Sequence, residues 1–238
     1  MTTPPPPGTA YLPAWYIPRP ALENRALATL ANEQPVLLWG PRDQGCTWLC
    51  RHLAERWQAA DGEAGRRLAV VDFRSLGSGA LASFDDCLRA IAIAIEEWLD
   101  EDPDFQPERD SIAERWTTMR GDPKVRLKNY VGRTVLPALP GPFLLVFDHA
   151  DLVHSRPFYE DFAGMLRSWA EKTKYATLPN KHPTPWKNLR LLVAVSVHPA
   201  RLRTKYYESP FVNLSDPIRV GDFDRKQITV LAEHHGLA

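Results

Sequence analysis

The residues from Gly40 to Thr47, GPRDQGCT, have the spacing of a loop that binds phosphate groups. In the pattern G-x-x-x-x-G-K-[ST], backbone N–H groups surround the phosphates, the lysine contacts the terminal phosphates and the hydroxyl residue binds Mg²⁺. Gly40, Gly45 and Thr47 match this pattern, but Cys46 stands at the lysine position. We expect a thiol at a helix N-terminus to be partly ionised, which would place negative charge where phosphate should bind.

The charged residues inside the loop act in opposite directions on an anionic ligand. Asp43 repels phosphate, whereas Arg42 is the nearby cation that could compensate for the missing lysine. A turn between a strand and a helix that binds no ligand is the plain structural alternative for the whole segment.

A second candidate motif is FLLVFDHAD, residues 143–151. Asp148 ends an apolar run, where nucleotide hydrolases with this type of loop place an acidic Mg²⁺ ligand. The next position, at which a glutamate would polarise the attacking water, holds His149, and a neutral imidazole lacks the charge of a carboxylate. Thr47 and Asp148 are therefore the candidate Mg²⁺ ligands. Arg42 and His149 are the candidates to restore hydrolysis, although a polar residue at a strand end is the simpler interpretation of His149.

Strands and helices must position these motifs, and the alternation of apolar runs with helical periods predicts an α/β fold. The third and fourth predicted strands are almost continuously apolar, which is typical of parallel strands covered by helices on both faces. Ser83 and Asp86 predict a capping box at the start of a helix with an apolar stripe of Leu88, Ile91, Ala92, Ile95, Trp98 and Leu99. The expected strands are 36–39, 68–73, 143–148, 191–196 and 217–220, and further helices are expected at about 22–33, 46–60, 124–137 and 157–171.

Composition and charge exclude several classes of protein. Of the 238 residues, 44% are hydrophobic and 24% are charged, as in ordinary globular domains. Lys plus Arg equals Asp plus Glu at 29 each, so net charge does not attract nucleic acid. The three cysteines suit a reducing compartment, and there is neither a signal peptide nor an apolar run long enough to span a membrane. We therefore expect a cytoplasmic protein without membrane contact.

The chain divides into a short tail and one large domain. Residues 1–14 are rich in proline and are expected to form a flexible extended tail, and residues 15–238 are expected to form a single domain. Among the eight tryptophans, we expect Trp39, Trp48, Trp57 and Trp98 in the core. Trp15, Trp116 and Trp186 lie near the ends of predicted elements and could contact a partner instead.

Basic residues interleaved with aromatic residues form a third candidate site, in the segments 171–190 and 201–207. This pattern can bind nucleic acid through phosphate contacts and stacking. A solvated loop or a protein-binding surface is the more common explanation, and the neutral overall charge favours it. The candidate residues are Lys172, Lys174, Lys181, Lys187, Arg201, Arg203 and Lys205.

The ordered set of segments resembles the bacterial AAA-like ATPase domain, a relative of the signal-transducing STAND ATPases. The resemblance covers residues 16–237 and includes LLWGPRDQGCTWL (37–49), FLLVFDHADLV (143–153), LRLLVAVSVHPARL (189–202) and SPFVNLSDPIRVGDF (209–223). It implies a three-layer P-loop NTPase fold with a five-stranded, mainly parallel sheet and the phosphate-loop strand near its centre. The chain departs from the family's motifs at Asp43, Cys46 and His149.

The resemblance also suggests further nucleotide contacts and a lid. It places Ser196 at the sensor position at the end of the fourth strand, and Tyr16 and Arg19 in the entry segment that flanks the base. The helix expected at 224–237 resembles the start of a small helical lid, of which the chain contains only the beginning. The full set of candidate nucleotide-binding residues is Gly40, Arg42, Gly45, Cys46, Thr47, Asp148, Ser196, Tyr16 and Arg19.

Three functional hypotheses follow. The preferred one is an AAA-like domain that has lost hydrolysis, requires no cofactor and acts as a scaffold or regulatory protein-interaction module in a bacterial signalling or conflict system. The second is a switch that binds ATP or ADP with Mg²⁺ and turns it over slowly or not at all. The third is a nucleic-acid-binding accessory subunit. The resemblance implies a protein partner or multiprotein assembly, with homo-oligomers among the options.

Overall fold

The computed structural model describes residues 11–60, 65–105, 110–176, 184–202 and 214–237. Its sheet has five parallel strands in the order β2-β3-β4-β1-β5, which confirms the predicted architecture. β4 is the central strand, and β1 lies one place from the edge because it pairs with β4 and β5. The phosphate-loop strand thus lies near the centre of the sheet, directly beside the central strand, as expected. The strands are β1 (Val36–Trp39), β2 (Arg67–Asp72), β3 (Phe143–Asp148), β4 (Leu189–Val195) and β5 (Ile218–Arg219).

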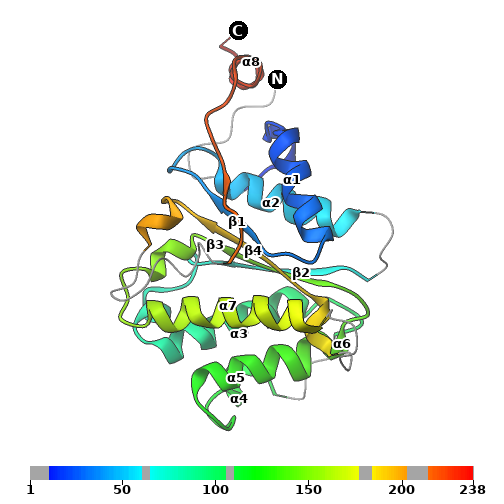
Figure 1. The fold of residues 1–238 in the computed structure, drawn as a ribbon, viewed down its shortest axis with the longest axis vertical. Helices are drawn as coiled ribbons and strands as arrows, with labels where there is room; N and C mark the ends of the chain where they lie inside the picture. Colours follow the sequence, from blue (N-terminus) through cyan, green and yellow to red (C-terminus); the bar gives the residue numbers. More distant parts are fainter. Residues whose placement is uncertain (1–10, 61–64, 106–109, 177–183, 203–213, 238) are drawn as a thin grey trace.

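Helices cover both faces of the sheet and give the predicted three layers (Figure 1). Side chains that alternate along each strand contribute to two separate cores, as the geometry of a strand requires. Leu38 and Val70 belong to the core beneath α1 and α2, whereas Leu37 and Val71 belong to the core on the opposite face. The helices are α1 (Pro20–Ala31) and α2 (Cys46–Ala59) on one face, and α3 (Phe84–Leu99), α4 (Ile112–Arg115), α5 (Pro123–Asn129), α6 (Leu136–Ala138) and α7 (Tyr159–Ala176) on the other.

The helix predicted at 124–137 is interrupted. A π-helical turn, Tyr130–Val135, separates α5 from α6. A Cβ atom on Gly132 would lie 2.8 Å from the indole of Trp186, so this turn needs glycine for the tryptophan to approach. Short 3₁₀ helices cover Pro13–Trp15, Ser78–Leu81, Ala150–Val153, Pro185–Asn188 and Pro199–Arg201.

Only one of the two hydrogen bonds of the predicted capping box is present at the start of α3. The Ser83 hydroxyl accepts a hydrogen bond from the Asp86 backbone N–H, as an N-cap does. The Asp86 carboxylate accepts from the same hydroxyl at 2.6 Å, and not from the Ser83 backbone as a full capping box requires.

Two tryptophans occupy the opposite of their expected environments. Trp98 lies on the last turn of α3 and is 45% exposed, whereas Trp116 is fully buried. Trp116 Nε1 donates to Asp85 at 2.9 Å, so its polar atom is satisfied inside the protein. The sequence pattern placed Trp98 on the apolar stripe of a helix and Trp116 near the end of an element, but it could not show what packs over either residue.

The first and last described segments pack against each other and against α2. Tyr11, predicted to belong to a flexible tail, donates to Glu55 at 3.1 Å, and its ring contacts Trp48. Residues 1–10 lie outside the described ranges. The last helix, α8 (Arg225–His234), projects from the sheet, and its His234 ring contacts Trp15. Within the described ranges, no helix has the length and apolar character that crossing a membrane requires.

Candidate nucleotide-binding site

The loop between β1 and α2 has the backbone shape that its glycines predict. Gly45 immediately precedes α2 and has a φ of 76°, in the left-handed region that favours glycine. Gly40 needs to be small for another reason, because a Cβ there would lie 2.7 Å from the Val220 carbonyl oxygen. Asp43 also has a positive φ, 67°. The loop therefore presents the positive end of the α2 dipole, which is a general anion-binding feature.

A large open cavity of about 1200 Å³ lies at this helix end. The strands, helices and entry segment that contribute to it are far apart in sequence but meet at the carboxyl edge of the sheet, where ligands bind in open α/β folds. All the candidate nucleotide-binding residues line it: Tyr16, Arg19, Gly40, Arg42, Gly45, Cys46, Thr47, Asp148 and Ser196.

Cys46, at the lysine position, is uncharged at neutral pH. Burial, together with the nearby carboxylates of Asp148 and Asp151, raises the pKa of its thiol to about 12, and the Arg19 guanidinium lowers it only in part. Our expectation of a partly ionised thiol was therefore wrong, and Cys46 provides neither the positive charge of lysine nor a repelling negative charge.

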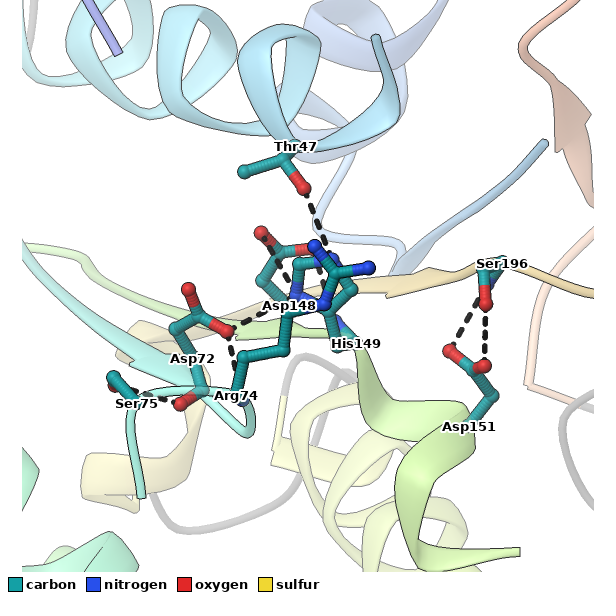
Figure 2. A network of polar contacts seen from close by, with 8 residues as sticks. All are labelled: Thr47, Asp72, Arg74, Ser75, Asp148, His149, Asp151 and Ser196. Carbon is teal, nitrogen blue, oxygen red and sulfur yellow. Dashed lines mark hydrogen bonds and ion pairs between the residues drawn. The ribbon is translucent and has the colours of Figure 1, made fainter. Parts of the chain in front are cut away.

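His149 is the centre of a polar network that joins the two motifs (Figure 2). Its Nε2 lies 3.3 Å from the Thr47 hydroxyl, and its Nδ1 lies 3.0 Å from Asp72 Oδ1. The backbone N–H of His149 donates to Asp148 Oδ1 at 2.9 Å. His149 has a φ of 55°, in the left-handed region, which is uncommon for a residue with a side chain. It is thus a buried connecting residue, and not simply a polar residue at a strand end.

Asp72 is the site residue that our sequence interpretation missed. It ends β2 as Asp148 ends β3, and the two are register partners in the parallel pair. A signal was present in the sequence, because two neighbouring apolar strands both end in aspartate. Parallel strands bring such ends to the same edge, but without knowing that β2 and β3 are neighbours the pairing could not be inferred.

The two aspartates have opposite pKa shifts. Burial raises the pKa of Asp148, the neighbouring Asp72 charge adds to this, and the His149 ring and Thr47 hydroxyl lower it only in part. The pKa of Asp72 is lowered, because hydrogen bonds from the His149 ring and the Arg74 backbone outweigh the effect of burial. Asp148 Oδ2 is buried and has no hydrogen-bond partner among the described residues.

Mg²⁺ would be held by Thr47 and Asp148 in a phosphate loop of this type. The unpartnered Asp148 Oδ2 suits a cation. The Thr47 hydroxyl, however, already contacts His149 Nε2, so its use as a metal ligand requires this contact to break. The donor set therefore fits Mg²⁺ in part, through Asp148.

Ser196, at the expected sensor position, is held by another residue. Its backbone N–H donates to Asp151 Oδ1 at 2.9 Å and its hydroxyl donates to Asp151 Oδ2 at 2.5 Å (Figure 2). A hydroxyl that gives its proton to a carboxylate can only accept further hydrogen bonds. It is therefore oriented unfavourably for an anionic phosphate.

Arg19, and not Arg42, is the cation whose side chain the fold holds against the phosphate loop. Arg19 is 6% exposed, and its guanidinium donates to the Gln44 carbonyl at 2.7 Å and to the Gly221 carbonyl at 2.6 Å. Arg42 lines the cavity but is exposed, and it forms no hydrogen bond or ion pair with the described residues. Arg19 is the fixed cation of the loop, which the sequence could not show because it is 25 residues away from Gln44.

Tyr16, which is expected to flank the base, lines the cavity with a largely buried side chain. Its hydroxyl donates to Glu23 at 2.9 Å, and its ring stacks on His52 with a centroid distance of 4.0 Å.

The basic candidates for nucleic-acid binding do not form one group where the structure describes them. Lys187 precedes β4 and Arg201 follows it, so they lie at opposite edges of the sheet. Lys172 and Lys174 are on the last turns of α7, and Lys172 lies over the ring of Trp186. Lys181, Arg203 and Lys205 lie outside the described residues.

Comparisons with known proteins are consistent with this fold. A family model described as the AAA-like domain matches residues 9–238. The ORC2 protein of Aeropyrum pernix in its ADP form has a TM-score of 0.61 and 15% sequence identity, covering 97% of this chain and 55% of that chain. A Walker-type ATPase of Pyrococcus abyssi has a TM-score of 0.54 and 18% identity, covering 92% of this chain and 57% of that chain.

The ORC1 protein of Aeropyrum pernix in complex with DNA has a TM-score of 0.54 and 17% identity, covering 94% of this chain and 51% of that chain. At these identities the likeness shows the fold alone. The chain spans about half the length of the solved proteins it matches. No curated protein sequence matches it.

Proposed function

Because the chain belongs to the AAA-like domain family, we propose that it is a hydrolysis-inactive member that acts as a regulatory protein-interaction module. One observation carries this proposal. The cavity of the family is formed, but the two positions that supply charge for hydrolysis hold a neutral thiol, Cys46, and a histidine, His149. Phosphoryl transfer relies on positioned charge, so this cavity lacks its main source of catalysis.

The contacts of His149 support the same proposal. A histidine that activates water needs a free ring nitrogen directed at that water. Here Nε2 faces Thr47 and Nδ1 faces Asp72, so both ring nitrogens have protein partners. His149 therefore does not replace the missing glutamate without rearranging.

The interaction role is supported by the surface of α8. Ile228 is 54% exposed and Val230 is 38% exposed on this projecting helix (Figure 1). Two residues apart on a helix, these side chains do not share one face, but both leave apolar surface on α8 accessible to a protein partner. From the resemblance to domains related to STAND ATPases, we propose that the partner belongs to a bacterial signalling or conflict system.

Calorimetric titration with Mg-ATP and with Mg-ADP, together with a phosphate-release assay, tests the proposal. We expect no phosphate release and no detectable binding by the native chain. Cys46→Lys should bind measurably, since one added ion pair with phosphate contributes about 1.4 kcal/mol or more, which is about tenfold in affinity. The matched control is Gln58→Lys, which adds the same charge elsewhere in the cavity. Phosphate release that is lost in Arg42→Ala or His149→Asn would contradict the proposal.

A nucleotide-gated switch without turnover is the second candidate, and the contacts of Arg19 favour it. Arg19 joins the phosphate loop at Gln44 to Gly221, in the segment that leads from β5 to α8. A ligand that moved this guanidinium would also move the connection to α8, which we assign to the start of a lid. Micromolar binding of ATP or ADP by the native chain, without phosphate release, would support this candidate over a nucleotide-free scaffold.

A further inference from the structure

Three side chains that can bind a metal ion converge in the cavity. Asp72 ends β2, Asp148 ends β3, and His149 follows directly. One ligand atom from each lies within 4.8 Å of the others. Because β2 and β3 pair in parallel with Asp72 opposite Asp148, the sheet itself sets the separation of the two carboxylates.

The measured separations suit a transition-metal ion. His149 Nδ1 lies 3.0 Å from Asp72 Oδ1 and 3.6 Å from Asp148 Oδ2. Zinc bonds to nitrogen and carboxylate oxygen are about 2.0–2.2 Å long, and bond angles between about 90° and 110° then place ligand atoms about 3.0–3.5 Å apart. The first separation lies in this range and the second is just above it, so a modest movement of the side chains would bring the ligand atoms around one ion.

A second, independent observation, a buried carboxylate oxygen without a hydrogen bond to the described residues, also indicates a cation site. Asp148 Oδ2 has no hydrogen-bond partner among the described residues, and the Asp148 side chain is only 3% exposed. Buried polar atoms are almost always partnered by protein, water or an ion. A cation bound to this oxygen would satisfy it.

The orientation of His149 also suits metal binding. In the metal-free chain Nδ1–H donates to Asp72, and a bound ion would replace this proton. With Nε2–H then donating to the Thr47 hydroxyl, 3.3 Å away, the lone pair on Nδ1 would face the ion between the two carboxylates. Histidine ligands in metal sites are usually oriented in this way by a hydrogen bond from the other ring nitrogen. The ring lies between Thr47 and Asp72 and contacts both (Figure 2).

We propose that Asp72, Asp148 and His149 bind one divalent transition-metal ion of the class represented by Mn²⁺, Co²⁺ and Zn²⁺, in the absence of nucleotide. An imidazole nitrogen with two carboxylates selects this class over Mg²⁺, which prefers oxygen ligands only. The site differs from the Mg²⁺ site expected at Thr47 and Asp148, because His149 supplies a ligand and Thr47 only orients it. All three ligands line the open cavity, which provides an entry path. This inference does not depend on the proposed function.

Calorimetric titration of the nucleotide-free chain with ZnCl₂ and with MgCl₂ tests the site. We expect one Zn²⁺ per chain with micromolar or tighter affinity, and Mg²⁺ binding at least about 100-fold weaker. His149→Asn and Asp148→Asn should each weaken Zn²⁺ binding at least about tenfold. Asparagine is chosen at position 149 because it tolerates a positive φ. The matched control is His198→Asn, which removes an exposed imidazole outside the cavity and should leave affinity unchanged.

Zn²⁺ affinity that is unchanged in His149→Asn, or Mg²⁺ binding as tight as Zn²⁺ binding, would overturn the proposal. Circular dichroism establishes that each variant is folded. If His149→Asn does not fold, Asp72→Asn provides the same test, since it removes a ligand at a partly exposed position. The visible absorption of bound Co²⁺ gives a further readout: bands characteristic of a nitrogen and oxygen ligand set support the site, and a spectrum of hydrated Co²⁺ contradicts it.

Discussion

Two buried carboxylates beside the same cavity have opposite properties. The side chain of Glu23 on α1 is 4% exposed and that of Asp148 at the end of β3 is 3% exposed. The pKa of Glu23 is lowered and that of Asp148 is raised. Burial tends to raise the pKa of both, so burial alone does not explain the difference.

The number of hydrogen-bond donors explains it. Glu23 accepts from the Arg19 backbone at 2.6 Å, from the Tyr16 hydroxyl at 2.9 Å and from Arg56 at 2.8 Å, and His52 lies 3.5 Å away. Asp148 Oδ1 accepts from the His149 backbone, whereas Oδ2 has no hydrogen-bond partner among the described residues and lies 3.6 Å from His149 Nδ1. A carboxylate that is fully satisfied stabilises the fold, whereas one left unsatisfied costs stability and is available to a ligand.

The largest expected effect is that of Glu23→Gln. We expect it to lower the free energy of unfolding by about 3 kcal/mol at pH 7, because it removes a charge that several buried donors require. Chemical denaturation followed by circular dichroism measures this. The control Glu55→Gln affects an exposed residue and should cost about 0.5 kcal/mol or less. Equal losses in the two variants would show that the donors around Glu23 contribute little.

The Glu23 effect should depend on pH in a defined direction. Its folded pKa lies below its unfolded pKa, so the stability that it contributes is present above the unfolded pKa of about 4.3. This contribution is lost as the pH falls through the folded pKa. Unfolding free energies of the native chain and Glu23→Gln, measured from neutral to acidic pH, should therefore converge. A constant difference would contradict the assignment.

Asp148→Asn should change the free energy of unfolding in the opposite direction from Glu23→Gln. We expect it to raise the free energy of unfolding by about 1 kcal/mol at pH 7, since an acid with a raised folded pKa destabilises the fold once it is ionised. Below the unfolded pKa of about 3.9 the gain should disappear. Thermal denaturation in metal-free buffer measures the change, and a lower melting temperature at pH 7 would sink this prediction.

Asp72→Asn should have the smallest effect on the free energy of unfolding. It compares Asp72 with its register partner on β3, Asp148. Asp72 accepts from the His149 ring and from the Arg74 backbone, both at 3.0 Å, but its side chain is 20% exposed. We expect a loss of about 0.5 kcal/mol, because solvent screens these interactions. A gain like that predicted for Asp148→Asn would mean that burial, and not hydrogen bonding, distinguishes the two strand ends.

Much of the fold could be predicted from local sequence patterns. The apolar runs located all the strands to within two residues at most ends, and the loop glycines located the start of α2. These features depend on side-chain periodicity and on backbone conformations that are set within a few residues. The interruption at Tyr130–Val135 was missed, because it depends on the contact between Gly132 and Trp186, which are far apart in the chain.

The candidate site divides in the same way. The sequence by itself determined the parallel α/β architecture, the phosphate-type loop and the replacement of its lysine by Cys46. Only the tertiary structure decided that Cys46 stays neutral, that Asp72 lies opposite Asp148 and that His149 joins Asp72 to Thr47. The reason is physical: pKa values and ligand sets depend on burial and on distances between groups from different elements, and strand order sets these distances.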